Sequence, residues 1–166
     1  MTKSKITIIN TGGTFNKVYN TISGVLEVSK NSKALEEILR YCYNVDFEVI
    51  TIISKDSLDM NEDDRELIVQ TIDKIQNEKI IIVHGTDTMD LSSSFVDKFI
   101  KNKIIVFLGA MLPISINKVE ATLNFAMALG FLNANVEKGV YISMHGSVKG
   151  YKDIKKDRKL GQFLGI

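Results

Sequence analysis

Two turns in this sequence place a threonine directly after glycine, where a hydroxyl could act as a nucleophile. Thr14 ends the run TGGT at 11–14, and Thr86 stands beside Asp87 in the run HGTDT at 84–88. A hydroxyl nucleophile needs a base or a cation to activate it. Asp87 could accept charge, and a lysine could serve as the base if its surroundings lowered its pKa. The residue types therefore predict nucleophilic chemistry, although the sequence pattern leaves open which lysine takes part.

The second turn also has a purely structural interpretation. Aspartate is a favoured helix N-cap, so Asp87 or Asp90 could do no more than begin the following helix. One cap accounts for one residue, whereas the run from Gly85 to Thr88 combines a glycine, two hydroxyls and a carboxylate. We therefore expect a functional site at this turn.

Histidine and cysteine offer other chemistries, which the spacing does not favour. The sequence contains no G-x-S-x-G elbow around a serine and no H-x-x-x-H pair, so neither a serine–histidine mechanism nor a histidine metal site is indicated. We expect hydrogen-bonded structural roles for His84 and His145. Cys42 is the only cysteine, and we expect it to be a buried apolar thiol on a helix.

The elements that would position these turns are visible as five apolar segments, each followed by a polar or glycine-rich turn. They cover residues 6–10, 47–53, 80–83, 104–108 and 140–144, and their composition is typical of parallel strands buried on both faces. Helical patterns separate the strands. The sequence therefore predicts an α/β fold of three layers, in which a mostly parallel sheet is flanked by helices. Ligands bind such sheets at the carboxyl ends of the strands.

The helical segments are expected to begin near residues 32, 61, 91 and 118, and the second to run to about residue 77. Asn61, with Asp64 three residues later, has the pattern of an N-cap. Spacing predicts that one face of each helix is buried, whereas Asn124 could be exposed or buried. The side chains predicted to face inward are Ala34, Leu35, Ile38 and Leu39; Leu67, Ile68, Thr71, Ile72 and Ile75; Leu91, Phe95, Val96, Phe99 and Ile100; and Val119, Leu123, Ala126, Met127 and Phe131.

Two segments show little periodicity. Residues 15–31 have the composition of a long loop with a short hairpin, which could cover a site as a lid. The tail at 150–166 is weakly periodic and locally basic.

Composition excludes several classes of protein. The chain has 166 residues and a net charge of +1, which predicts one domain and gives no electrostatic reason to expect nucleic acid binding. The first apolar run is too short for a signal peptide or a membrane span, so we expect a cytoplasmic protein. The glycines at 12 and 13 match neither a dinucleotide loop nor a P-loop, and we predict no cofactor.

Three motifs together resemble the bacterial-type L-asparaginase family of amidohydrolases. They are TGGT at 11–14, HGTDTM at 84–89 and GAM at 109–111, and their order and separations also match. The resemblance covers nearly the whole chain, but only the amino-terminal domain of the two-domain family. It implies a single asparaginase-like domain over 1–166, without the family's carboxyl-terminal domain. It also implies hydrolysis of the side-chain amide of asparagine, or of a related small amide, through a threonine acyl-enzyme.

The resemblance also implies roles for the catalytic residues. Thr14 matches the family's nucleophile, and Thr86, Asp87 and a lysine match its second catalytic group. The segment GYKDIKK at 150–156 is similar to the stretch that carries this lysine. Alignment on its aspartate indicates Lys156, with Lys155 as the alternative.

The substrate-binding residues follow from the same resemblance. Ser57 and Asp59 match the residues that hold the α-carboxylate and the α-amino group of the substrate, which require a hydroxyl donor and a carboxylate. Leu58, Gly13 and Gly85 would line the same site. Backbone N–H groups near Thr86 and Leu58 would stabilise the oxyanion.

The sequence departs from the family pattern at three places. Tyr19 is the one tyrosine in the loop, and it lies closer to Thr14 than the family's lid tyrosine does, so its catalytic role stays open. Leu58 and Leu112 replace polar residues common at those positions. A neighbouring subunit's second domain, which completes the amino-group site in the family, is missing here.

These departures leave three hypotheses. The first is an asparaginase-type hydrolase working as a homo-oligomer, a dimer or a tetramer. The second is an amino-acid-binding or regulatory protein with weak or no turnover. The third is a hydrolase of another small amide or ester.

Overall fold

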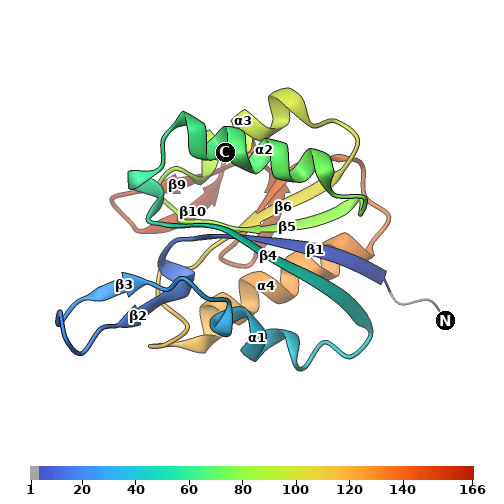
Figure 1. Ribbon diagram of the computed structural model, residues 1–166. Helices are drawn as coiled ribbons and strands as arrows, with labels where there is room; N and C mark the ends of the chain where they lie inside the picture. Colours follow the sequence, from blue (N-terminus) through green and yellow to red (C-terminus); the bar gives the residue numbers. More distant parts are fainter. Residues whose placement is uncertain (1–3) are drawn as a thin grey trace.

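The computed structural model describes residues 4–166. In this part of the chain, six strands form one sheet in the order β4-β1-β5-β6-β7-β8 (Figure 1). All neighbouring pairs are parallel except β7–β8. The strands are β1 (Ser4–Gly12), β4 (Val45–Lys55), β5 (Lys79–Val83), β6 (Ile104–Leu108), β7 (Gly139–Met144) and β8 (Ser147–Gly150). The prediction of a mostly parallel α/β sheet is confirmed.

Helices cover both faces of this sheet. Figure 1 shows α2 (Glu62–Lys74) and α3 (Met89–Phe99) on one face, with α1 (Lys33–Leu39) and α4 (Lys118–Asn133) on the other. Successive strand residues point to opposite faces, so the central strands divide their side chains between two cores. Ile80 and Ile82 belong to the α2–α3 core, whereas Ile81 and Val83 belong to the α1–α4 core. This explains why the central strands are continuous runs of branched aliphatic residues.

The predicted inward face of α3 is partly wrong. Leu91 and Phe99 are exposed, whereas the buried side chains include Ser92 and Ser93 together with Val96. Small hydroxyl residues let α3 lie close to its neighbours, and Ser92 accepts a hydrogen bond from the Arg65 side chain at 3.2 Å.

For α4 the predicted buried face is also wrong, and it differs from the observed face by a larger rotation about the helix axis than for α3. Val119 and Leu123 are exposed, at 74% and 48%, and the buried residues are Ala121, Asn124, Phe125, Ala128 and Leu132. The helix carries apolar residues on nearly every side, so spacing alone could not identify the face that meets the sheet. Asn124, for which the sequence allowed either position, is buried and donates to the Gly109 carbonyl at 2.9 Å.

Three other details differ from expectation. Helix α2 ends at Lys74 rather than near residue 77, and Leu67 is exposed. Asn61 is the N-cap of α2 as predicted, and with Asp64 it forms a reciprocal capping box. Cys42 is half-buried in the turn after α1, not buried on the helix, and partial burial raises the pKa of its thiol.

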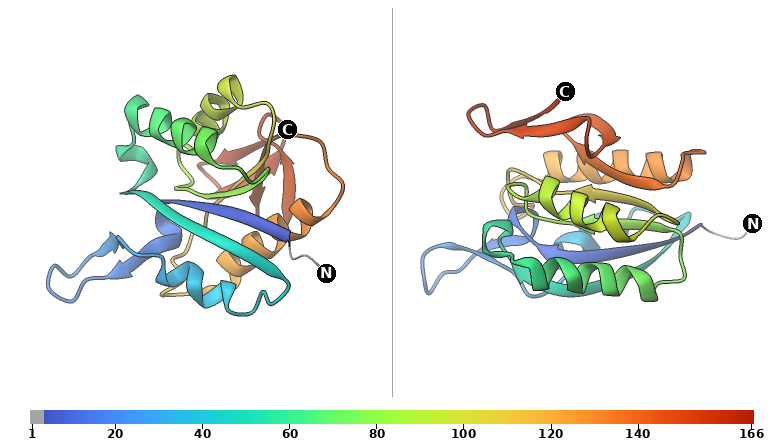
Figure 2. Two further views of the ribbon diagram at one scale, coloured as in Figure 1. Left: turned by 45° about the vertical axis from the view of Figure 1, so that its right-hand side comes forward. Right: turned by 90° about the horizontal axis from the view of Figure 1, so that it is seen from above.

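Both weakly periodic segments contain antiparallel hairpins outside the main sheet. Strands β2 (Lys17–Tyr19) and β3 (Leu26–Val28) pair in the loop after β1, and Figure 2 shows this hairpin projecting from the body of the molecule. In the tail, β9 (Ile154–Asp157) pairs with β10 (Gln162–Gly165). No helix within residues 4–166 is long and apolar enough to cross a membrane.

Candidate active site

Three neighbouring strands end at one place, where backbone packs directly against backbone. A methyl group built on Gly13, after β1, would lie 2.5 Å from the Cα of Gly85, after β5. A methyl group on Gly85 would in turn lie 2.6 Å from the Cβ of Ser57, after β4. Real Cβ atoms do not approach other atoms so closely, so glycine is required for this contact. The contact brings the turns that carry Thr14 and Thr86 together at one edge of the sheet.

Lys156 reaches this edge from the β9–β10 hairpin, far along the chain. Its ammonium donates to Thr86 Oγ1 at 2.8 Å and to Asp87 Oδ1 at 2.9 Å. The Lys156 side chain is 12% exposed and that of Asp87 32%, so water screens the pair only partly. The result is a hydroxyl, a carboxylate and an ammonium in direct contact. Lys155, its neighbour on β9, is exposed.

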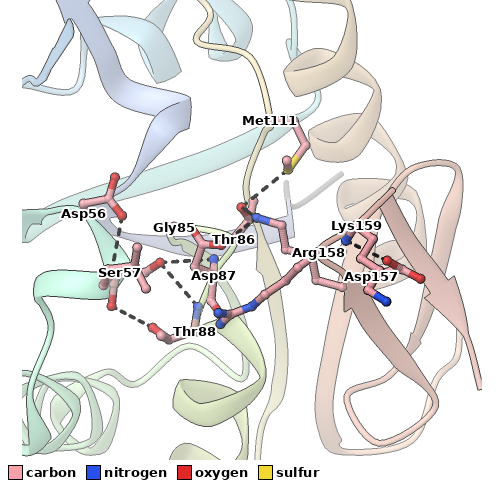
Figure 3. Close-up of polar contacts among 12 residues, drawn as sticks. Asp56, Ser57, Gly85, Thr86, Asp87, Thr88, Met111, Asp157, Arg158 and Lys159 are labelled. Carbon is pink, nitrogen blue, oxygen red and sulfur yellow. Dashed lines mark hydrogen bonds and ion pairs between the residues drawn. The ribbon is translucent and has the colours of Figure 1, made fainter. Parts of the chain in front are cut away.

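The same cluster includes Arg158, which the sequence patterns did not identify, and Met111 of the GAM motif, to which they gave no role. Arg158 donates to the backbone carbonyl of Asp87 at 2.9 Å, and Met111 Sδ accepts from the Thr86 hydroxyl at 3.5 Å. Figure 3 shows both converging on Thr86 and Asp87. Nothing in the sequence distinguished Arg158 from the other basic residues of the tail. A pocket of about 400 Å³ opens here, lined by Thr86, Asp87, Asp90, Leu91, Lys155, Lys156, Arg158 and Phe163.

Ser57 holds the start of α3 from a neighbouring turn. Its Oγ accepts the backbone N–H groups of Asp87 at 3.2 Å and Thr88 at 3.4 Å, and Thr88 Oγ1 donates to the Ser57 carbonyl at 2.8 Å (Figure 3). Thr88, at the N-cap position of α3, makes no side-chain cap bond. Ser57 therefore fixes the two residues that precede the helix, while Asp90 Oδ1 accepts the Leu91 N–H at 2.9 Å in the first turn. Because Oγ accepts both bonds, its own hydrogen remains available to donate to a ligand.

The turn after β4 is fixed by an ion pair beside the site. Lys17 contacts Asp56 at 2.7 Å, and the Leu58 N–H also donates to Asp56, at 3.4 Å. Burial alone would raise the pKa of Asp56, but the bonds from Lys17 and from the backbone outweigh it and lower that pKa. Leu58 and Asp59 are exposed. No side-chain hydrogen bond to another residue of 4–166 holds the Asp59 carboxylate, so it is free to meet a ligand.

Thr14 and Tyr19 are less constrained. Thr14 is half-buried at the start of a short 3-10 helix (Thr14–Asn16), and its hydroxyl forms no hydrogen bond within the described residues. Tyr19 lies on β2, 61% exposed, and its hydroxyl is near Gly24 at the tip of the hairpin, 3.9 Å from where a Cβ would be. In this structure no hydrogen bond joins the two residues.

His84 lies directly behind the Gly85–Thr86 peptide. Its ring is fully buried and packs edge-on against Phe107. Burial lowers the pKa of His84 to about 4, so the ring is neutral and its Nδ1–H donates to the Gly85 carbonyl at 2.7 Å. Because the C=O and N–H of a trans peptide point in opposite directions, this bond directs the Thr86 N–H away from the histidine. No acceptor within residues 4–166 takes that N–H.

A larger pocket lies elsewhere. It measures about 640 Å³ and is lined by Lys5, Phe47, Glu48 and Lys74 among others, where β1 and β4 begin and α2 ends. This is the end of the sheet opposite to Thr86, and among the described residues no lysine there hydrogen-bonds a hydroxyl. In the described residues no three His, Cys, Asp or Glu side chains are grouped as metal ligands.

Known proteins are similar to this chain in sequence and in fold. Residues 5–159 match the family model described as asparaginase, N-terminal. The chain is 29% identical over 164 residues to a probable periplasmic L-asparaginase of Haemophilus influenzae, covering 91% of this chain and 46% of that protein. It is also 29% identical over 144 residues to a subunit of the glutamyl-tRNA(Gln) amidotransferase of Nanoarchaeum equitans, covering 84% of this chain and 36% of the relative.

The fold is also similar to that of a solved structure. The thermostable L-asparaginase from Thermococcus kodakarensis superposes with a TM-score of 0.86 at 25% identity, over 98% of this chain and 51% of that one. The chain therefore spans about half the length, or less, of these relatives.

Proposed function

This chain belongs to the asparaginase family, and from that premise we propose that it hydrolyses the side-chain amide of asparagine, or of a related small amide, to the acid and ammonia. One observation carries the proposal most directly: Lys156 bonds both Thr86 and Asp87, on a turn whose backbone contacts the turn of Thr14. A structural ion pair would need only the lysine and the carboxylate. The added hydroxyl is what an amide-cleaving site requires.

The proposed reaction has two steps. The Thr14 hydroxyl attacks the amide carbon while its proton passes to the Thr86–Lys156 pair, and the Thr86 N–H stabilises the oxyanion that forms. The pair passes that proton to the amide nitrogen, the C–N bond breaks, ammonia leaves and an ester on Thr14 remains. Water then attacks the ester carbon, its proton passes through the same pair to the Thr14 oxygen as the ester bond breaks, and the free acid leaves.

The choice of Thr14 as the nucleophile rests on the family, because the local geometry favours the other threonine. Lys156 contacts Thr86 Oγ1, whereas no described residue bonds the Thr14 hydroxyl. In the proposed arrangement Thr86 and Lys156 move protons, and Thr14 becomes engaged only when a substrate is bound. Catalytic hydrogen bonds are often absent before substrate binds.

The substrate's charged ends would meet the turn after β4. We propose that the Ser57 hydroxyl, with its free hydrogen, donates to the α-carboxylate and that the Asp59 carboxylate binds the α-ammonium group. Gly13, Gly85 and Leu58 would line the space between. Asparagine and glutamine share these two charged ends, so both are candidate substrates.

A second function is favoured by one feature. Within residues 4–166 no side chain bonds the Asp59 carboxylate, and exposed Tyr19 makes no hydrogen bond to Thr14, so the amino-group site and the lid are incomplete in this part of the chain. A protein that binds an amino acid with little turnover would fit this arrangement. We keep it as the alternative.

An ammonia-release screen tests the proposal. Wild-type protein is assayed with asparagine, glutamine, their D-forms and aspartyl peptides, beside Thr14→Ala and Thr86→Val. Release from at least one amide by the wild type, and loss of it in both variants, supports hydrolysis. Calorimetric binding of aspartate or asparagine without any release would support the alternative instead.

Oligomeric state and location are part of the same proposal. Leu112, Val119 and Leu123 are exposed apolar residues, and a homo-oligomer would cover such surface. We propose a cytoplasmic homo-oligomer in which residues 1–166 act as one domain. Light scattering on the purified chain measures its size.

A further inference from the structure

The hairpin that carries Lys156 is not part of the main sheet. Strands β9 and β10 pair only with each other, and Figure 2 shows them at one edge of the molecule. A two-stranded hairpin alone is at best marginally stable in water. Contacts with the body of the protein must therefore hold it if the Lys156 ammonium is to stay on Thr86.

One such contact is a hydrogen bond to His145, in the turn between β7 and β8. Its Nδ1 accepts the backbone N–H of Phe163, in β10, at 3.1 Å. The Phe163 ring is buried and packs edge-on to the histidine ring, with centroids 6.0 Å apart. Phe163 is also the residue paired with Lys156 across the hairpin. A bond at Phe163 thus holds the hairpin at the position of the lysine.

The other ring nitrogen of His145 bonds to the body of the protein. Nε2 lies 3.0 Å from Glu120 Oε1, on α4. A nitrogen that accepts an N–H carries no hydrogen, so in the neutral ring the hydrogen is on Nε2 and is donated to Glu120. The two ends of the histidine therefore have fixed and opposite roles, acceptor toward β10 and donor toward α4.

Glu120 continues the connection to Met111, another residue that bonds Thr86. Its carboxylate accepts the N–H groups of Met111 at 2.8 Å and Leu112 at 3.1 Å. Met111 in turn accepts the hydrogen bond of the Thr86 hydroxyl through Sδ. The pair of His145 and Glu120 therefore joins the two segments whose side chains bond the Thr86 hydroxyl, the β9–β10 hairpin and the segment of Met111.

The backbone of His145 is also held in an uncommon conformation. Its φ of 50° is the only positive value at a residue other than glycine among residues 4–166. Its N–H donates to Asn124 Oδ1 at 3.0 Å, and Asn124 is fully buried. Conformations of this kind persist where surrounding contacts fix them, and here those contacts direct the ring between α4 and β10.

We propose that His145 is a positioning residue: through Nδ1 it holds Phe163, and thereby keeps the Lys156 ammonium in contact with Thr86 and Asp87. Its effect on the rate rests on the proposed function, whereas its effect on the hairpin does not. Small displacements of a catalytic group can reduce a rate about 100-fold.

Two substitutions separate the two ends of the ring. In His145→Asn the amide oxygen lies near the position of Nδ1, so the bond from Phe163 is kept and that to Glu120 is lost. In His145→Gln the amide reaches the position of Nε2, so the Glu120 bond is kept and that from Phe163 is lost. Asparagine also tolerates a positive φ well.

Hydrogen exchange across residues 154–165 and steady-state kinetics are measured on the full chain. We expect His145→Gln to speed exchange in the hairpin alone and to lower kcat about 10- to 100-fold with little change in KM. His145→Asn should stay near the wild type in both. The proposal would be overturned if both variants showed wild-type hydrogen exchange in the hairpin. It would also be overturned if exchange and kcat changed equally in the two variants.

Two further readouts keep the inference testable. If the wild type releases no ammonia, the exchange comparison still decides whether His145 holds the hairpin. If neither variant folds, nitrogen NMR of the wild-type ring decides instead: a hydrogen on Nε2 supports the proposal, and a hydrogen on Nδ1 excludes it.

Discussion

Gly13 packs against Gly85 with no space for a side chain between them: a methyl group on Gly13 would lie 2.5 Å from the Cα of Gly85. Gly13 also has a φ of +74°, a conformation that other residues rarely adopt. Each glycine is followed by a threonine, so this contact sets the separation of the two hydroxyls. The site depends on backbone packing before it depends on any catalytic side chain.

A methyl group at this contact should disrupt both stability and activity. We expect Gly13→Ala to lower the free energy of unfolding by about 2 kcal/mol or more, because a strained φ and a backbone clash add together. The matched control is Gly130→Ala on α4, where nothing lies within 4 Å of the added carbon. That change should stabilise the protein by up to about 1 kcal/mol. Urea unfolding measures both, and a Gly13→Ala variant as stable as the wild type would contradict the packing described.

Lys156 and Lys155 form a matched pair on one strand. Lys156→Met removes the ammonium that bonds Thr86 and Asp87, and we expect ammonia release to fall at least about 1,000-fold, as it does when members of a catalytic unit are removed. Lys155→Met changes an exposed side chain and should leave the rate within about 3-fold of the wild type. If ammonia release fell equally in the two variants, the effect would come from the charge of the tail rather than from the contact with Thr86.

Ser57 should contribute to stability as well as to binding. Ser57→Ala leaves the N–H groups of Asp87 and Thr88 without the oxygen that accepts them, and a buried donor left without an acceptor costs about 1–3 kcal/mol. Asp59→Asn, at an exposed carboxylate, should change stability by less than about 0.5 kcal/mol but raise KM for an amino-acid amide. Denaturant unfolding and kinetics on both variants check this, and an unchanged midpoint for Ser57→Ala would argue against its role in holding this turn.

His84 predicts a specific dependence of stability on pH. Its pKa is about 4 in the folded protein, against 6.5 for the ordinary group, so between these values the unfolded chain binds more protons. The contribution of His84 to the free energy of unfolding is therefore fully present above about pH 7. It is lost as the pH decreases toward 4, which lowers that free energy by on the order of 3 kcal/mol.

The control for this prediction is His84→Asn, whose amide can still donate to the Gly85 carbonyl but does not titrate. Its unfolding free energy should vary less between pH 7 and 4. Asp56 and Asp64, whose pKa values are lowered, act mainly below that range. If the unfolding free energy depended on pH equally in the variant and in the wild type, His84 would not be buried in its neutral form.

The strands were predictable because their chemistry is local. Branched aliphatic runs such as 80–83 and 104–108 are buried on both faces, and each is soon followed by glycine. Helix rotation was harder to predict. Val119 and Leu123 have the right spacing for a core face but are exposed, because α4 has an apolar alternative in Ala121, Phe125 and Ala128.

The other residues of the site are positioned by contacts between segments far apart in the chain. Such contacts cannot be predicted from the local patterns of a single sequence. Lys156 comes from a weakly periodic tail, and its position depends on β9 pairing with β10 and on Phe163 reaching His145. Family resemblance selected Lys156, whereas residue pattern alone left every lysine open. Arg158 and Glu120 had no signal of either kind.

The central claim is that an amide substrate acylates Thr14 while Lys156 and Thr86 move the protons. Intact-protein mass spectrometry of an acid-quenched reaction with asparagine tests it most directly, with peptide mapping to locate the adduct. We predict an aspartyl ester on Thr14, absent from Thr14→Ala and more abundant in Lys156→Met if that variant slows hydrolysis of the ester more than its formation. An adduct on Thr86, or product formation at the wild-type rate by Thr14→Ala, would contradict it.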